Sequence, residues 1–264
     1  MAINLTKSSN NPVLSAERFL NAEPAADGDV MTLEGTLGRS MFLLLVVFGA
    51  ALWPWTAFFQ NYVPNAETQS IPNMNLFLWG GLIAGLVLSL IISFAPKTAP
   101  WLAVPYAFCE GIFLGALSAT FEMMYPGIAL QAIAATFGVA MVMLGLYAAR
   151  IIQPTQRFRA VLFGATAAIG LFYLVALVLS FIGVGQGFLQ PLLWGSGIIG
   201  IGFSVVVCIV AALNLITDFG IIEDGVRARA PKYMSWYGAF ALLVTLVWLY
   251  IEVLRLLAKL RGRD

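Results

Sequence analysis

The chain has 264 residues, of which 61% are hydrophobic and only 10% are charged, and its mean hydropathy is +0.90. Soluble domains are about 45–50% apolar, so this composition excludes a soluble globular protein and indicates an integral membrane protein. The net charge of +1 does not point to a nucleic-acid partner, and the lack of histidine excludes His-based catalysis and His-ligated zinc.

Seven apolar stretches are long enough to cross a membrane, which takes about 20 residues for a hydrocarbon core roughly 30 Å thick. Lipid leaves no backbone polar group unpaired, and these stretches lack the alternation of barrel strands, so the spans must be helices. The sequence therefore predicts an all-α polytopic membrane protein with seven transmembrane helices, at residues 40–59, 75–95, 101–121, 127–149, 160–182, 195–222 and 236–257.

Residues 1–38 are polar and mixed in charge, and we predict a cytoplasmic, partly disordered tail ahead of a membrane domain at 39–264. The tail has no apolar core of the signal-peptide kind, so we expect the first span to direct insertion. The longest predicted connection follows that span and contains the turn formers Pro64, Asn65, Pro72 and Asn73.

The distribution of basic residues predicts the orientation, because cytoplasmic loops retain Lys and Arg. Ten of the 14 basic residues lie in the tail or in alternate loops, which predicts a cytoplasmic amino terminus. The other four follow the seventh span and would lie outside if that span crosses fully, or inside if it is re-entrant, and we favour a full crossing. These four are Arg255, Lys259, Arg261 and Arg263.

Small residues four apart on a helix allow close packing of helix backbones. We expect packing of this kind, without a chemical role, at Gly81 and Gly85, Gly111 and Gly115, Gly164 and Ala168, and Gly195, Gly197, Gly200 and Gly202. Both cysteines, Cys109 and Cys208, lie within spans, so they are interpreted as packing residues rather than a disulfide framework.

Three of the 13 acidic residues lie well within predicted spans: Glu110 on the third, Asp218 on the sixth and Glu252 on the seventh. Ionisable groups at membrane depth are costly and are functional candidates by default. The rise of a helix places Glu110 about 15 Å, Asp218 about 10 Å and Glu252 about 31 Å from the predicted cytoplasmic face.

Two carboxyl groups at similar depth in a water-poor bundle could form a proton-sensitive latch or, when both are ionised, a cation site. Oxygen ligands suit calcium, and the hydroxyl of Thr217 or free carbonyls could complete such a site. Structural roles are the alternative: a local cap or pair for Asp218, a hydrogen bond between helices for Glu110, and a pair of Glu252 with Arg255.

Enzymatic chemistry is not supported by the residues at membrane depth. Gly195-Ser-Gly begins a span and is followed by no base, so it is not a nucleophile elbow. An intramembrane aspartyl protease needs two facing aspartates, and only Asp218 lies at that depth. We therefore expect no enzyme and no bound cofactor.

Five phrases of the sequence are informative in combination: Ser9-Asn-Asn-Pro-Val-Leu, Met31-Thr-Leu-Glu-Gly-Thr-Leu-Gly-Arg, Tyr106-Ala-Phe-Cys-Glu-Gly-Ile-Phe-Leu-Gly, Asp218-Phe-Gly-Ile-Ile-Glu-Asp-Gly and Thr245-Leu-Val-Trp-Leu-Tyr-Ile-Glu-Val-Leu-Arg-Leu-Leu. Together they resemble the bacterial branch of the Bax inhibitor-1 family, and the resemblance covers nearly the whole chain.

The resemblance implies a central last helix wrapped by the other six and a pH-sensitive calcium leak or calcium/proton exchange in a bacterial cytoplasmic membrane. It implies a proton-sensing acidic pair, which is also a candidate calcium site. Asp218 matches the acid on the sixth helix, and Glu252, in Leu-Tyr-Ile-Glu, matches the one on the seventh, where other branches have aspartate. Glu110 is the alternative partner of Asp218, because the depths of these two residues are similar.

A second hypothesis needs no ion pathway. Some bacterial relatives resemble modulators of a membrane protease, so the chain could be a regulatory protein that binds another membrane protein. Loss of a crosslinked partner after removal of residues 1–38, together with no ion flux, would support this second hypothesis.

Overall fold

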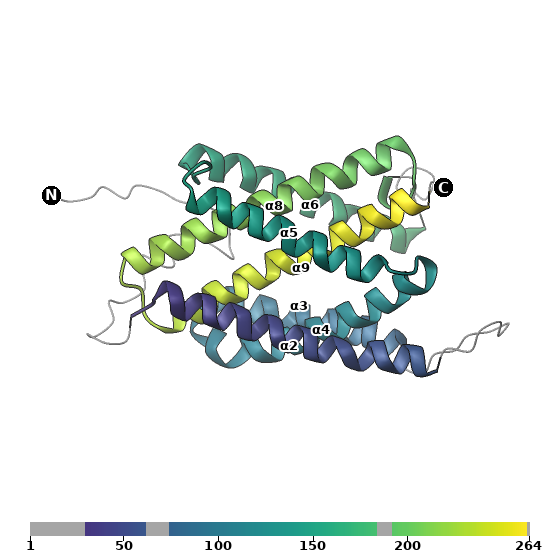
Figure 1. Ribbon diagram of the computed structural model, residues 1–264, viewed down its shortest axis with the longest axis horizontal. Coiled ribbons are helices and arrows are strands. Elements are labelled where there is room, and N and C mark those ends of the chain that lie inside the picture. The colour runs from purple at the N-terminus through teal and green to yellow at the C-terminus, as the bar shows by residue number, and fades with distance from the viewer. Residues whose placement is uncertain (1–29, 62–73, 184–191, 263–264) are drawn as a thin grey trace. The chain divides into compact units, whose positions relative to one another are not determined.

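The computed structural model describes residues 30–61, 74–183 and 192–262 (Figure 1). Predictions for the first 29 residues, for the connection with its four turn formers and for Arg263 fall outside this part of the chain. The described residues form a short 3-10 turn, η1 (Pro96–Thr98), and seven long helices: α2 (Leu33–Gln60), α3 (Met74–Phe94), α4 (Ala99–Met124), α5 (Ile128–Ala148), α6 (Gln156–Ile182), α8 (Ile198–Arg227) and α9 (Tyr233–Arg261).

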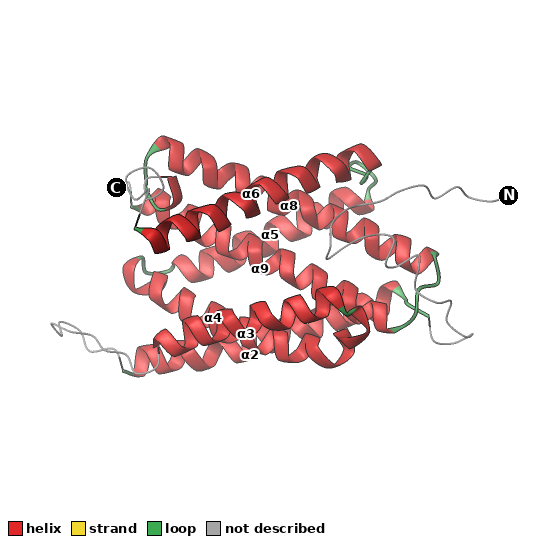
Figure 2. Cartoon of the chain, turned by 180° about the vertical axis from the view of Figure 1, so that it is seen from behind, coloured by secondary structure: helices red, strands yellow, loops and turns green. Residues whose placement is uncertain are grey.

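Each of these seven helices is long and apolar enough to cross a membrane, and each overlaps one predicted span. The predicted fold class is therefore confirmed, and Figure 2 shows helices joined by loops in the described part of the chain. The largest difference in bounds is at α2, which begins at Leu33. Thr32 caps it, because its hydroxyl accepts a hydrogen bond from the backbone N–H of Gly35 at 3.1 Å.

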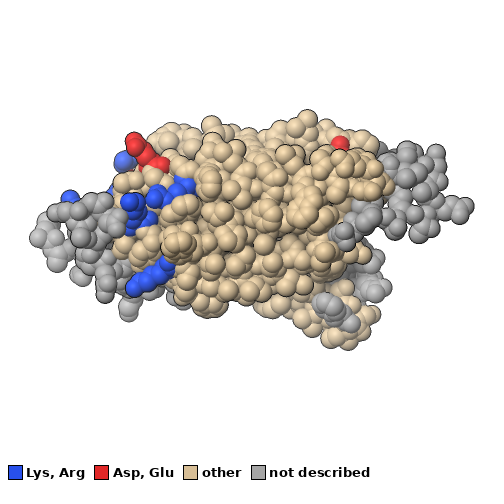
Figure 3. Space-filling model, turned by 90° about the horizontal axis from the view of Figure 1, so that it is seen from below, with Lys and Arg blue, Asp and Glu red and all other residues tan. Residues whose placement is uncertain are grey.

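The outer surface of the helices is apolar, as contact with lipid requires. Only 22% of the residues in the apolar 18-residue stretch of α3 are buried, and the exposed side chains of this helix include Leu76, Trp79, Ile83 and Phe94. Uncharged residues cover nearly all of the described surface visible in Figure 3. The chain is therefore a multi-pass membrane protein.

Local signals extend or end the helices beyond the apolar stretches. Glu223 and Arg227 form an ion pair one turn apart, which prolongs α8 past its apolar part. The hydroxyl of Thr155 caps α6 by accepting from the N–H of Phe158 at 3.3 Å. At its other end α6 stops at Gly183, whose φ of 76° is a left-handed conformation that glycine adopts readily.

The chain divides into two compact units, and the described part of the first comprises residues 130–183, 192–220 and 245–262. Its helical parts are most of α5, all of α6, most of α8 and the second half of α9. Leu162 and Ile169 on α6 pack against Val207 and Val210 on α8, and Trp248 on α9 lies against this cluster. The apolar cluster therefore joins α6, α8 and α9 within this unit.

The described part of the second unit comprises residues 30–61, 74–129 and 221–244. Its helices approach at the predicted glycines: a Cβ at Gly111 would lie 2.5 Å from the carbonyl oxygen of Val47 on α2. A Cβ at Gly81 on α3 would lie 2.9 Å from the carbonyl oxygen of Cys109 on α4. The prediction of close packing is therefore confirmed at these glycines.

The same prediction is wrong for three glycines of the first unit. A Cβ at Gly164, Gly197 or Gly202 would meet no atom within 4 Å. Gly164 lies on α6, and only 11% of the residues in the apolar 18-residue stretch of this helix are buried. A small residue permits a close approach only where its face turns toward another helix, and the spacing along the chain does not reveal that rotation.

Helix α9 is the most buried of the seven long helices, because 61% of the residues in its apolar 18-residue stretch are buried. In the first unit its Trp248 packs on the cluster of α6 and α8. In the second unit its Phe240 meets Tyr106 of α4 at a ring distance of 4.9 Å, and Gly238 lies against Thr36 of α2. The predicted central position of the last helix is therefore confirmed.

Candidate functional site

Asp218 lies on the buried face of α8. Ala211 and Leu215 precede it by seven and three residues, a spacing that puts all three on one side of a helix. Both neighbours are fully buried, and only 2% of Asp218 is exposed. The carboxyl group is therefore held inside the protein by the same helical periodicity that buries the apolar residues.

The two oxygens of the Asp218 carboxyl group have different surroundings. The side chain of Thr245 on α9 makes a hydrogen bond with this carboxyl group. Oδ2 is buried and has no hydrogen-bond partner among the described residues, and the same is true of Oγ1 of the adjacent Thr217. A buried oxygen without a partner costs free energy, so this position is suited to a proton or a cation.

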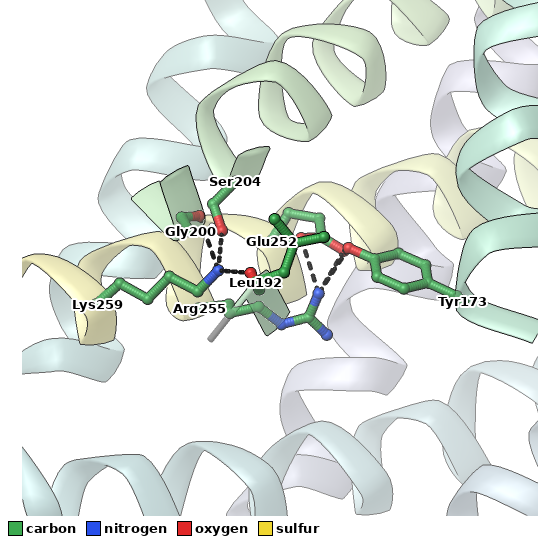
Figure 4. A network of polar contacts seen from close by, with 7 residues as sticks. All are labelled: Tyr173, Leu192, Gly200, Ser204, Glu252, Arg255 and Lys259. Carbon is green, nitrogen blue, oxygen red and sulfur yellow. Dashed lines mark hydrogen bonds and ion pairs between the residues drawn. The ribbon is translucent and has the colours of Figure 1, made fainter. Parts of the chain in front are cut away.

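Glu252 on α9 is 1% exposed and lies in a network of its own. Nη1 of Arg255 donates to both of its carboxylate oxygens at 3.1 Å, and the hydroxyl of Tyr173 on α6 donates to Oε1 at 2.9 Å (Figure 4). The guanidinium also lies over the rings of Tyr173 and Trp194, at 5.2 and 5.4 Å. The pair of Glu252 with Arg255, which the spacing offered as a structural alternative, is thus formed.

Asp218 and Glu252 make separate contacts in the first unit. On α9 the residue that reaches Asp218 is Thr245, and Glu252 follows it by seven residues. That interval corresponds to about 10 Å along a helix. The contacts of Asp218 therefore come from one stretch of α9, and the network of Glu252 lies about two turns farther along.

Glu110 belongs to the second unit, where it is 9% exposed on α4. It shares a hydrogen bond with the hydroxyl of Tyr106, one turn earlier on the same helix. Gly85 of α3 leaves room for the carboxyl group, because a Cβ there would lie 2.9 Å from Oε1 of Glu110. This hydrogen bond lies within α4, whereas the structural alternative drawn from the sequence was a bond to a neighbouring helix.

The described residues contain no group of three or more His, Cys, Asp or Glu side chains that could hold a metal ion. A calcium ion at Asp218 would therefore take its other ligands from hydroxyl groups, backbone carbonyls and water, all of which calcium accepts. Cys109 and Cys208 are both free thiols, as the sequence predicted.

The sequence did not predict the polar contacts of three residues: Thr245 with Asp218, Tyr173 with Glu252, and Lys259 with three oxygens. Lys259 is 3% exposed and is bound by oxygens of the segment before α8 and of α8 itself. One signal was present, because residues 252, 255 and 259 follow the i, i+3, i+7 spacing that puts side chains on one helix face. Tyr173 and Thr245 carried no such signal, since each contacts a residue on a different helix.

Comparison with known proteins gives one result for the whole chain. The model of the family described as Bax inhibitor 1 like matches residues 11–262. No curated protein and no solved structure matches the chain.

Proposed function

Because the chain belongs to the Bax inhibitor-1-like family, we propose that it forms a proton-regulated pathway through which calcium leaks, or exchanges for protons, across a bacterial cytoplasmic membrane. Asp218 is the gate or an ion ligand in this pathway. The amino terminus is cytoplasmic, and α9, with 29 residues, crosses the membrane fully. The proposal assigns the protein no enzymatic activity.

The observation that carries the proposal is the buried oxygen of Asp218. Its Oδ2 has no hydrogen-bond partner among the described residues, although only 2% of the residue is exposed. A cation that reaches an ionised carboxylate in such a place stabilises it. A protonated carboxyl group is neutral and needs no cation. Proton binding and cation binding at Asp218 would therefore exclude each other, which is what a proton-regulated pathway requires.

Glu252 and Glu110 are the candidate partners of Asp218 in proton sensing, and Glu252 is also a candidate calcium ligand. Glu252 could take part only by releasing Arg255, which now neutralises its charge. Glu110 could take part by releasing the hydroxyl of Tyr106. In both cases the side chain must exchange one partner for another, whereas Asp218 already has a free oxygen.

The test is calcium flux into liposomes that contain the purified protein, measured at acid and at neutral pH. We expect the rate to change with pH for the natural chain and to lose this change in Asp218→Asn. Glu223→Gln is the matched control, because it removes a carboxylate from the same helix at a partly exposed position. Flux with an unaltered rate and pH response in Asp218→Asn would show that the gating role is wrong.

Absence of calcium flux from the natural chain at every pH would favour the other function, a regulatory protein that binds a second membrane protein. In that case mild crosslinking in cells should recover a membrane partner. The partner should be lost when residues 1–38 are removed and retained when Asp218 is replaced with Asn.

A further inference from the structure

Lys259 is a buried cation at the carboxyl-terminal end of α9. Only 3% of the residue is exposed, although it lies in the last turn of the helix. An ammonium group has three N–H donors and no acceptor. Nζ donates to the carbonyl oxygens of Leu192 and Gly200, both at 2.9 Å, and to Oγ of Ser204 at 2.8 Å (Figure 4).

The three oxygens come from two adjoining pieces of chain. Leu192 lies in the segment before α8, and Gly200 and Ser204 lie one turn apart at the start of α8, so they face the same side. All three groups are uncharged. Carbonyl and hydroxyl oxygens are the ligands with which membrane proteins replace the water shell of a monovalent cation.

The nearby charges do not account for the burial of Lys259. The charged or titratable groups that act on it are Glu252 and Arg255 on α9 and Cys208 on α8. Arg255 already pairs with Glu252, so the charge of Lys259 is left without a carboxylate of its own among these three residues. The ammonium group is therefore held by neutral oxygens and not by a carboxylate in the described part of the chain.

We propose that the oxygens of Leu192, Gly200 and Ser204 form a binding site for a small monovalent cation or a primary ammonium ion, and that the chain fills this site with its own Lys259. The lysine acts as a tethered ligand: it satisfies the oxygens and prevents a free cation from entering at this end of α9. The inference concerns a different part of the chain from Asp218 and does not depend on calcium transport.

Removal of the lysine should turn the filled site into an open one. Lys259→Ala deletes the ammonium group and most of the methylene chain that carries it. The three oxygens lose their partner, and a space opens beside them. The variant should be less thermostable than the natural chain in detergent. Its melting temperature should rise saturably with ethylammonium, methylammonium or potassium, because a ligand that binds only the folded state stabilises it.

Tetramethylammonium at the same ionic strength is the control salt, because it carries the same charge but has no N–H donor. Lys97→Ala is the matched control variant, since Lys97 is exposed. In this variant and in the natural chain, ethylammonium should raise the melting temperature no more than tetramethylammonium does. The double variant of Lys259→Ala with Ser204→Ala lacks one of the three oxygens, and its ethylammonium affinity should be weaker by about tenfold or more.

Equal responses to ethylammonium and tetramethylammonium in Lys259→Ala would overturn the proposal, and so would a natural chain that responds as strongly as the variant.

A second measurement serves if Lys259→Ala does not fold. An amine-reactive ester should modify Lys97 of the natural chain while sparing Lys259, and Ser204→Ala should make Lys259 react faster. Mass spectrometry of the peptides reports both sites. The proposal fails if Lys259 of the natural chain reacts as fast as Lys97.

Discussion

Replacing Arg255 with Met would leave Glu252 without its counter-charge inside the protein. The side chain of Glu252 is 2% exposed and that of Arg255 is 18% exposed. Removing one partner of a buried ion pair costs about 3–5 kcal/mol, because the other charge stays buried and unpaired. Tyr173 still donates to Oε1 at 2.9 Å, which places the expected loss near the lower end, about 3 kcal/mol.

The reverse replacement should cost less. In Glu252→Gln the guanidinium of Arg255 still lies over the rings of Tyr173 and Trp194 and has some access to water. The expected loss of stability is therefore about 1–2 kcal/mol. The double variant should be more stable than the sum of the two single losses implies, by about 1–3 kcal/mol, since neither charge is then left alone.

Unfolding in mixed micelles with increasing denaturing detergent, followed by tryptophan fluorescence, would measure these losses. Arg227→Met is the matched control, because it breaks an ion pair in which the two side chains are 64% and 38% exposed. Surface pairs contribute about 0–1 kcal/mol. If Arg255→Met destabilises the protein no more than Arg227→Met does, the inference that Glu252 depends on Arg255 is wrong.

Two further predictions concern helix packing and the second buried carboxyl group, and the same unfolding assay checks both. Gly111→Ala should destabilise the protein by about 1–3 kcal/mol, because its Cβ would lie 2.5 Å from the carbonyl oxygen of Val47. Gly138→Ala on α5, where no atom lies within 4 Å of a Cβ, should be neutral or stabilising; equal losses would contradict the packing argument. Tyr106→Phe should cost about 1–3 kcal/mol by leaving Glu110 without its hydroxyl partner, and an unchanged stability would indicate that the bond contributes nothing.

The fold was predictable because lipid restricts the backbone more strongly than water does. A stretch of about 20 apolar residues has to be a helix in a membrane, whatever packs against it. The bounds were less predictable, because they depend on polar contacts such as the cap at Thr32 and the ion pair of Glu223 with Arg227. These contacts extend α2 and α8 beyond their apolar stretches.

The site was predictable only where its contacts are local. The pair of Glu252 with Arg255 could be predicted from a spacing of three residues. The bond of Glu252 with Tyr173 joins residues 79 positions apart and depends on how α6 and α9 are rotated. Rotation also decides that Thr245 reaches Asp218, and nothing in the apolar pattern encodes it, because lipid-facing and protein-facing residues are equally apolar.

The space that Gly85 leaves for Glu110 has a consequence for sequence divergence. A side chain at position 85 would meet the Glu110 carboxyl group, since even a Cβ would lie 2.9 Å from Oε1. Mutations at the two positions are therefore coupled: a larger residue at position 85 requires the Glu110 side chain to move or to shorten. Among homologous chains these positions should covary, and a large residue at one should accompany a small residue at the other.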